Sequence, residues 1–466
     1  MRIFNRYYTT YDLVLLLGDV ALALLSTALL RLFVHLTGLS VHWDWTLALT
    51  QGAAIAAVVI LSFYYADLYA IDQTLSKREL LLRLANGFGF VCLIVAAATY
   101  LFPRLDLQDI YLLEMIVVGL GLFSWRLGFM KVLKRAMIWS RVLIVGTHRI
   151  GKMVAEELVR QKHLGMQVVG FVGAQRGQIS LSVGNPIRVS LPIFPKQELL
   201  SVVERSGVNR ILVAGASSIE DFPALEPVWL RLRGIPIEDC HTFYERLMSK
   251  IAITDLHPGW IALSSGFRRS PWILFTKRLI DIAVSAVGLV CSAPLALLAA
   301  IAIKLDSPGP VLYRQERVGQ HERPFILYKF RSMFADAEAE TGPVWAAVDD
   351  PRVTRVGKII RKLRIDEIPQ MVNVLKGEMS FVGPRPERPY FVNRLKEKIP
   401  YYSLRFSVKP GITGWAQILH EYADSEEDAI EKLQYDLYYI KNISVIFDLQ
   451  IMLETLKVIL FGRGAQ

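Results

Sequence analysis

Two adjacent carboxylates, Asp366 and Glu367, lie in a part of the chain that is rich in lysine and arginine. In such a pair, one carboxylate can attack a phosphorus atom while the other holds a divalent cation that neutralises phosphate oxygens. Ile368-Pro369 follows and opens an apolar helix, so Asp366 could instead cap that helix. The spacing alone does not separate a phosphoryl-transfer site from a helix cap.

Cations in short, conformationally restricted motifs suit phosphate binding. Lys329 and Arg331 occur among aromatic residues in the run 328–333, and Arg352 ends an Asp-Pro-Arg sequence. Arg385 stands between two prolines in Gly-Pro-Arg-Pro, where a fixed backbone favours a two-pronged grip on phosphate. These four residues are our candidates for phosphate or substrate binding.

The composition indicates that part of the chain lies in lipid. Of its 466 residues, 53% are hydrophobic and only 21% are charged, and the formal net charge is +10. A basic excess needs an anionic partner: lipid headgroups, substrate phosphates or nucleic acid. The long apolar runs favour lipid and phosphates over nucleic acid. Three scattered cysteines indicate neither a disulfide framework nor a structural zinc site.

Four apolar runs, at 13–34, 45–65, 87–102 and 110–130, approach the ~20 residues that cross a bilayer as a helix. Basic residues before the first run, between the second and third, and from Arg126 onward predict that both ends of this region are cytoplasmic. Asp19 and Glu114 fall inside runs, and we expect them to form hydrogen bonds between helices rather than to mark a functional path.

From residue 141 the pattern changes to alternating strands and helices. We expect parallel strands at 142–145, 168–172 and 211–214, a helix at 152–160 and a loop at 175–192. The turn 146–151 resembles a dinucleotide-binding fingerprint, but His148 replaces its second glycine. A side chain there would obstruct a pyrophosphate, so we favour a structural or regulatory module.

A fifth apolar run, at 279–303, has basic residues on both sides, which conflicts with one-way crossing. Lys277 and Arg278 precede it, and Lys304 begins a basic stretch after it. Pro294 in its middle removes a helix hydrogen bond and kinks the axis. We expect a helix that enters the membrane, breaks at Pro294 and returns to the same face. An ordinary kinked span is the alternative.

The stretch from residue 277 to the end resembles the catalytic domain of the bacterial sugar transferases, the monotopic polyprenyl-phosphate phosphoglycosyl transferases. The amino-terminal spans and α/β module resemble the long form of that family, the exopolysaccharide-type enzymes. The matching positions are Lys277-Arg278 with Asp281, Pro294, 307–310, 328–333, 350–352, Asp366-Glu367, 383–386 and 410–417.

This resemblance implies a two-step reaction that begins the assembly of a surface polysaccharide. Asp366 would attack the β-phosphorus of a UDP-sugar and release UMP, and undecaprenyl phosphate would then take the phosphosugar from the enzyme. Glu367 would help to bind Mg²⁺, and Arg385 would hold phosphate. Lys277, Arg278 and Asp281 would lie where the re-entrant helix meets the headgroups. A homodimer in the bacterial inner membrane, with a cytoplasmic catalytic domain, is also implied.

The expected architecture is therefore membrane α plus α/β. It comprises four transmembrane helices at 1–135, a Rossmann-like module at 141–247, a connector at 248–272 and a mostly helical catalytic domain at 273–466 with a re-entrant helix at 279–303. The alternative function is a membrane glycosyltransferase that moves sugar without phosphate, although the chain has no Asp-x-Asp motif of the kind that many such enzymes use to bind metal. The transferred sugar cannot be inferred from these residues.

Overall fold

The computed structural model describes residues 2–3, 6–7, 10–37, 45–66, 68, 82–92, 94, 111–136, 140–161, 165–182, 188–215, 226–253, 256, 258–264, 266–267, 270–335, 337, 350–420 and 425–461. They form two compact units, and the main boundary lies between Glu238 and Asp239. Two short strands, β1 (Arg2–Ile3) and β2 (Arg6–Tyr7), pair near the amino terminus.

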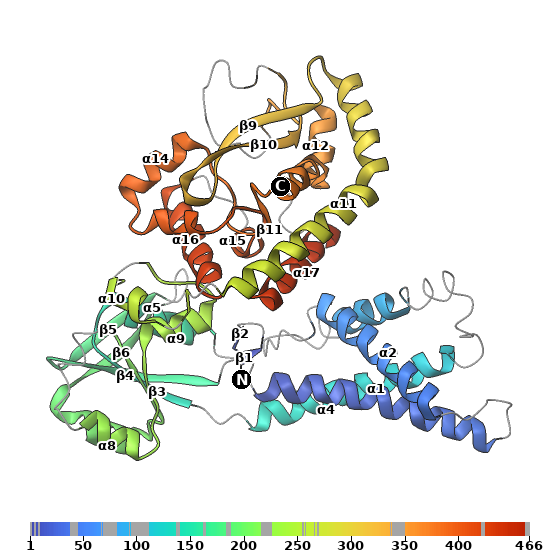
Figure 1. Cartoon of the computed structure of the whole chain (residues 1–466). Helices are drawn as coiled ribbons and strands as arrows, with labels where there is room; N and C mark the ends of the chain where they lie inside the picture. The colour runs from blue at the N-terminus through green and yellow to red at the C-terminus, as the bar shows by residue number, and fades with distance from the viewer. Residues whose placement is uncertain are drawn as a thin grey trace. The chain divides into compact units, whose positions relative to one another are not determined.

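Apolar helices make up the amino-terminal third: α1 (Thr10–Leu36), α2 (Trp45–Tyr65), a helical segment at 82–92 and α4 (Tyr111–Ala136) (Figure 1). Their inward side chains, such as Phe63, Val118 and Leu122, form one core. Most of the third expected run lies outside the described residues. Among the side chains that the structure describes here, the apolar helical stretches are Val14–Leu30, Gly52–Tyr65 and Ile116–Phe129, each shorter than a full span. Four transmembrane helices therefore stay a prediction.

Helices α1 and α4 are joined inside this core by an ion pair. Arg126 Nη2 lies 2.5 Å from Asp19 Oδ2, and neither residue is more than 2% exposed. Arg126 Nη1 also donates to the carbonyl oxygen of Leu68. A carboxylate in an apolar core needs such a partner, so Asp19 links helices as expected. The interpretation of Arg126 as a flanking charge is wrong, because its guanidinium is buried. The Glu114 side chain is not among those described.

The α/β module contains a six-stranded sheet in the order β5-β6-β4-β3-β7-β8. Strand β3 (Ser140–Val145) runs parallel to β4 (Met166–Gly173) and to β7 (Arg210–Val213), which confirms the expected Rossmann-like arrangement. The other elements are α5 (Arg149–Arg160), β5 (Gly177–Ser182), β6 (Arg188–Pro195), η3 (Lys196–Glu198), α6 (Leu199–Ser206), α8 (Glu226–Leu232) and β8 (Ile237–Asp239). Figure 1 shows α5 and α8 on opposite sides of the sheet.

The expected loop at 175–192 is wrong, because most of it pairs as the antiparallel strands β5 and β6. Ile179 and Leu181 alternate with exposed residues and bury one face of β5, a period-2 pattern that the glycine and serine content obscured. In the turn before α5, Gly146 adopts φ +93°, and a side chain at Gly151 would meet Ala214 Cβ at 2.9 Å. Both glycines that this turn keeps from the fingerprint thus have a structural use.

The second unit begins with two short helices, α9 (Cys240–Met248) and α10 (Pro258–Leu263). The long helix α11 (Pro271–Asp306) follows and includes the whole expected segment 279–303. It is the one helix of the described chain that is long and apolar enough to cross a membrane. Pro294 lies inside the helix, and the helix continues through it. The expected break at Pro294 is therefore wrong. Proline removes only one backbone donor, and the remaining helix bonds continue on either side.

The rest of the unit is mostly helical and surrounds short strand pairs. A hairpin of β9 (Leu312–Val318) and β10 (Pro324–Phe330) is followed by α12 (Arg355–Lys362), η5 (Ile365–Glu367) and α13 (Gln370–Lys376). The strand β11 (Ser380–Val382) then pairs in parallel with β12 (Gly411–Thr413). The remaining elements are η4 (Gln320–Glu322), α14 (Pro389–Lys398), η6 (Tyr402–Ser407), α15 (Trp415–Leu419), α16 (Glu426–Lys441) and α17 (Val445–Phe461).

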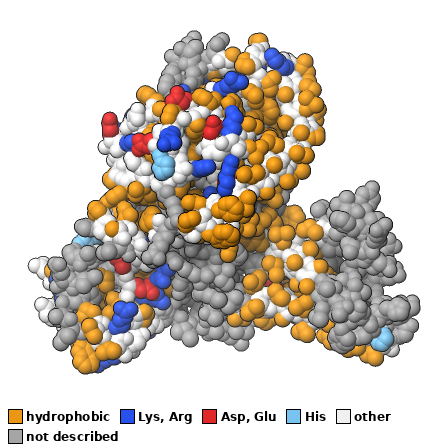
Figure 2. All heavy atoms as spheres, in the orientation of Figure 1, with side chains coloured by type: hydrophobic (Ala, Val, Ile, Leu, Met, Phe, Trp, Pro, Cys, Tyr) orange, Lys and Arg blue, Asp and Glu red, His pale blue; other side chains and the backbone are white. Residues whose placement is uncertain are grey.

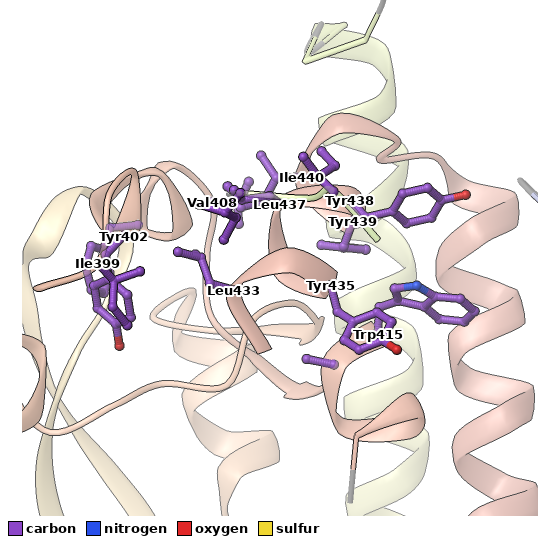
Figure 3. Packing of buried hydrophobic residues seen from close by; sticks show 14 of the residues in the cluster. Ile399, Tyr402, Val408, Trp415, Leu433, Tyr435, Leu437, Tyr438, Tyr439 and Ile440 are labelled. Atoms are coloured by element: carbon purple, nitrogen blue, oxygen red, sulfur yellow. The ribbon is translucent and has the colours of Figure 1, made fainter. Parts of the chain in front are cut away.

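One large apolar core holds these elements together. Trp415 and Tyr438 stack with ring centroids 6.4 Å apart, and Phe447 lies across both rings. Figure 3 shows Tyr402 and Ile399 at one end of this group and Trp415 at the other. The core thus spans from η6 to α17 and includes Val382 of β11.

Candidate active site

The two carboxylates lie on the short helix η5, between α12 and α13. Thr354 accepts a hydrogen bond from the Gly357 amide and starts α12, and Arg364 adopts φ +56°, which turns the chain into η5. Helix α13 begins after Pro369 without a side-chain cap. The interpretation of Asp366 as a helix cap is therefore wrong. Both carboxylates are mostly buried, with Asp366 7% and Glu367 9% exposed.

Two of the four candidate cations converge on Glu367. Lys329 Nζ donates to Glu367 Oε1 at 3.1 Å, and Arg385 Nη2 donates to the same oxygen at 3.2 Å. Arg364 Nη1 approaches this oxygen at 4.0 Å. A strand of the hairpin, the loop after β11 and the turn before η5 thus bring three positive charges to one carboxylate.

These charges separate the acidities of the adjacent carboxyl groups. Burial alone would raise the pKa of Glu367, but Lys329, Arg385 and Arg364 outweigh it and lower the pKa to about 2. Burial raises the pKa of Asp366, and the negative charge of Glu367 adds to the effect. Glu367 is therefore ionised at neutral pH, and Asp366 is the more basic carboxylate of the pair.

Asp366 makes no hydrogen bond or ion pair within the part of the chain that the structure describes. Its charge is balanced at longer range by Lys329, Arg361 and Arg385, each of which lowers its pKa against the effect of burial. A buried carboxylate with nearby cations and no hydrogen-bond donor keeps its lone pairs available for attack on an electrophile.

The position of Arg385 depends on two segments of the chain that pass unusually close together. Gly383 donates its amide to the Thr413 carbonyl, and a Cβ at Gly411 would lie 2.1 Å from the Gly383 nitrogen. Only glycine fits at this approach. Arg405, on η6, donates to the Arg385 carbonyl oxygen at 3.0 Å and fixes the loop from the other side.

Arg331 and Arg352 are not brought to this cluster. Arg331 is buried and donates to the carbonyl oxygens of Ser307 and Pro308, beyond the carboxyl end of α11. Arg352 contacts Asp350 through Nε and Nη2 and lowers the pKa of that carboxyl to about 2. In this structure Arg331 therefore holds the segment after α11, and Arg352 stabilises a local turn.

The residues expected near the headgroups attach the first half of α11 to the unit. Lys277 Nζ lies 2.7 Å from Asp448 Oδ2 and also donates to the Val382 carbonyl oxygen. Asp281 accepts from the Ser380 hydroxyl and the Phe381 amide. Arg278 donates to the carbonyl oxygens of Val374 and Leu375 at the end of α13, and Pro294 lies further along α11.

The donor set at the carboxylate pair fits Mg²⁺. The contacts of the Glu367 carboxylate with Lys329, Arg385 and Arg364 all use Oε1. Its Oε2 can therefore face a cation. Mg²⁺ in proteins is typically held by one or two carboxylates together with substrate phosphates and water. No three acidic, histidine or cysteine side chains converge within the described ranges, so a cation here would share its ligands with a substrate.

The sequence is similar to those of known bacterial sugar transferases. The model of a family described as bacterial sugar transferase matches residues 272–462. An undecaprenyl-phosphate glucose phosphotransferase of Komagataeibacter xylinus is 30% identical in an alignment that covers 90% of this chain and 84% of that protein. The chain belongs to the bacterial sugar transferase family.

Other bacterial sugar transferases match different shares of the chain. A UDP-glucose:undecaprenyl-phosphate glucose-1-phosphate transferase of Xanthomonas campestris is 28% identical and aligns with 97% of this chain and 94% of its own length. A UDP-N-acetylgalactosamine-undecaprenyl-phosphate N-acetylgalactosaminephosphotransferase of Aeromonas hydrophila is 45% identical over 235 residues, half of this chain and 55% of that protein. Relatives whose names give different sugars therefore align with different shares of this chain.

Sequence reasoning did not assign Arg361, Arg364 or Arg405 to the site. Arg361 and Arg364 belong to the basic stretch around the carboxylates and lie within five residues of Asp366. Their proximity to the carboxylates was the available signal. Arg405 lies in a stretch without a motif, and only the fold shows that it supports the Arg385 loop.

Proposed function

We propose that this protein transfers a sugar-1-phosphate from a UDP-sugar to undecaprenyl phosphate and so initiates polysaccharide assembly. The observation that carries the proposal is the match to undecaprenyl-phosphate sugar phosphotransferases along nearly the whole chain. The cluster of Asp366, Glu367, Lys329 and Arg385 supports it, because it combines a buried carboxylate that has no hydrogen-bond donor with cations that can bind phosphate oxygens.

In the proposed reaction, an oxygen of Asp366 attacks the β-phosphorus of the UDP-sugar. The bond from that phosphorus to the bridging oxygen breaks, and UMP leaves with the electron pair. Arg385 and Lys329 hold the phosphate oxygens, and Glu367 keeps both cations oriented. An oxygen of undecaprenyl phosphate then attacks the phosphorus of the aspartyl phosphosugar and restores the carboxylate. Mg²⁺ on Glu367 would neutralise phosphate charge.

We place the catalytic unit on the cytoplasmic face of the inner membrane, with α11 as a re-entrant helix. Both halves of α11 pack on the same unit: Asp281 near its start binds β11, and Ile303 near its end packs with Phe330. Between them the helix exposes apolar side chains, including Val290 and Leu298, and Figure 2 shows hydrophobic side chains over this helix. A helix attached at both ends to one unit suits entry and return on one face. The amino-terminal helices would add further spans.

The test is the release of UMP by full-length protein with Mg²⁺ and undecaprenyl phosphate. The donors are UDP-glucose, UDP-galactose, UDP-N-acetylglucosamine and UDP-N-acetylgalactosamine. We expect UMP from one or more donors, and no UMP above background from Asp366→Asn, which keeps the side-chain shape but removes the nucleophile. Release of UDP instead would support the alternative, a glycosyltransferase that moves sugar without phosphate. Full activity of Asp366→Asn would exclude the covalent route.

A further inference from the structure

The hairpin of β9 and β10 carries polar side chains beside the carboxylate cluster that the proposed reaction leaves without a task. Lys329 on β10, which donates to Glu367, lies directly opposite Tyr313 on β9. Opposed residues of an antiparallel pair place their side chains on the same face, with Cβ atoms about 5 Å apart. Tyr313 is therefore the next side chain beyond Lys329 on this face of the hairpin.

Three side chains of β9 form a row on this face. Tyr313, Gln315 and Arg317 alternate along the strand, so they share one face at intervals of about 7 Å. Gln315 Nε2 donates to the Tyr313 hydroxyl at 2.9 Å, and Arg317 Nη2 donates to Gln315 Oε1 at 2.6 Å. The row is thus ordered by its own hydrogen bonds.

The far end of this row returns to the loop that carries Arg385. Arg317 Nη1 donates to the Pro386 carbonyl oxygen at 3.0 Å. Pro386 follows Arg385, whose guanidinium donates to Glu367. Burial lowers the pKa of Lys329 against the charge of Glu367, and the positive charges of Arg385 and Arg317 add to the effect of burial. Strand pairing and hydrogen bonds therefore close a ring of residues that begins and ends at Glu367.

The side-chain amide of Gln315 has a fixed orientation. A guanidinium group only donates hydrogen bonds, so the atom of Gln315 that contacts Arg317 must be the oxygen. The contacts with Arg317 and Tyr313 use one lone pair of Oε1 and one hydrogen of Nε2. A primary amide has two of each, so one acceptor and one donor position remain side by side. This pair matches the N3–H group and a neighbouring carbonyl oxygen of uracil.

Tyr313 offers an aromatic ring to a base. It is 41% exposed, whereas Asp366 and Glu367 are buried. Proteins bind unpaired bases by stacking them on aromatic side chains and by hydrogen bonds to their Watson–Crick edges. The ring of Tyr313 and the amide of Gln315 supply both kinds of contact on one face.

We propose that the uracil of the UDP-sugar binds on this face of the hairpin, stacked on Tyr313 and hydrogen-bonded to the Gln315 amide, which Arg317 orients. This proposal rests on the proposed function, because it takes the phosphates of a UDP-sugar to bind Lys329 and Arg385. The α-phosphate and the ribose separate the β-phosphorus from the base, so the base lies beyond the cations, along the row. Cytosine has a donor at position 4 and an acceptor at N3, the reverse of uracil, so an amide of fixed orientation favours uracil.

The experiment measures the inhibition constants of UMP and CMP, and the KM for the UDP-sugar that releases UMP in the panel above, with full-length protein. We expect the wild type to bind UMP about 10-fold more tightly than CMP, and Gln315→Ala to lose this preference through weaker binding of UMP. Tyr313→Ala should weaken both nucleotides about 10-fold and raise the KM, because the stacking platform is lost. Tyr313→Phe keeps the ring and should recover most of the binding.

Matched controls are Leu312→Ala and Glu316→Ala, which remove exposed side chains from the opposite face of the same strand. The proposal is overturned if the wild type does not prefer UMP, or if Gln315→Ala keeps the wild-type preference, as a purely structural role would predict. It is also overturned if Tyr313→Ala binds both nucleotides as tightly as the controls do. Failure of the proposed function looks different, because then the wild type itself releases no UMP from any donor.

Discussion

The adjacent carboxylates at 366 and 367 have opposite shifts of pKa because only one of them touches cations. Three positive side chains lie within 4.0 Å of Glu367 Oε1, whereas Asp366 is balanced only through space. This division gives the pair two tasks. In the proposed reaction, the ionised Glu367 orients Lys329 and Arg385, and the more basic Asp366 is the nucleophile. The sequence predicted the residues but not the division, which depends on which side chain of the turn faces Lys329 and Arg385.

Glu367→Gln tests this division through the pH dependence of stability. The lowered pKa of Glu367 means that its ionised form stabilises the folded state at all pH values above about 4.5. That contribution, at most about 3 kcal/mol from the size of the shift, is lost as the pH falls from 4.5 towards 2. We expect the variant to unfold more easily than the wild type at pH 7, with a smaller difference at pH 4. Thermal unfolding in detergent at the two pH values measures the difference in stability between the wild type and the variant. If this difference grows as the pH falls, the lowered pKa of Glu367 is contradicted.

Asp436 should show the opposite dependence on pH. Burial raises its pKa to about 6, despite the ion pair with Arg405. Because the folded state binds this proton more tightly than the unfolded state, the group favours folding more as the pH falls from 6 to about 4, by up to about 3 kcal/mol. In Asp436→Asn this gain is absent, so the wild type should gain stability over the variant between pH 7 and pH 4. The midpoints of urea unfolding at both pH values give the comparison. An unchanged difference would contradict the raised pKa.

At the scale of elements, α11 shows what a sequence can and cannot predict. Basic flanks and Pro294 predicted a helix that enters and leaves the membrane on one face, and this topology stays a prediction, although both ends of the helix pack on one unit. The sequence did not predict that the helix continues unbroken through Pro294, because the loss of one hydrogen bond leaves many others to maintain it. Nor could it predict that Arg331 binds carbonyl oxygens beyond the end of this helix, since that contact requires the fold.

Cysteine labelling tests whether α11 enters and leaves on one side. In a chain whose native cysteines are replaced by alanine, Ser270→Cys precedes the helix and Glu316→Cys follows it, and both positions are outside the apolar segment. We expect a membrane-impermeant maleimide to label both in inside-out vesicles and neither in right-side-out vesicles. The native Cys291, within the helix, serves as a protected control when it alone is retained. Labelling of the two flanks from opposite sides would show a spanning helix instead.

Arg331→Lys tests whether this guanidinium holds the end of α11. Arg331 donates to the carbonyl oxygens of Ser307 and Pro308 and to the Ser307 hydroxyl. Lysine keeps the charge but cannot span these acceptors as a planar fork, so we expect a loss of about 2 kcal/mol of stability. Differential scanning fluorimetry gives the shift in Tm. Lys329→Met is the comparison: there we expect the larger effect on donor KM. If Arg331→Lys has a normal Tm and a raised KM for the UDP-sugar, Arg331 binds phosphate and does not hold the end of α11.

At the scale of the whole molecule, the sequence predicted the Rossmann-like sheet and the family, since parallel strands and ordered motifs are local signals. It did not predict how the segment after the sheet is used. Helix α9 belongs to the second compact unit, and its Glu245 makes a buried ion pair of 2.6 Å with Lys441 on α16. Ser249 accepts a hydrogen bond from the Trp415 indole. These contacts join residues nearly 200 positions apart, which no local pattern can reveal.

The segment that follows the sheet should therefore be a structural part of the catalytic unit. Glu245→Ala would leave the buried Lys441 ammonium without its carboxylate, although the Trp260 ring lies 4.1 Å from it. We expect a loss of about 3–5 kcal/mol in the stability of the catalytic unit, and a comparable loss for Lys441→Ala. Replacing both residues by methionine should recover much of it, because no charge is then left buried. The half-life of UMP release at raised temperature reports on this unit in the full-length protein, and Glu431→Ala, which breaks the more exposed pair with Lys250, is the matched control. An unchanged half-life in Glu245→Ala would show that the catalytic unit is stable without α9.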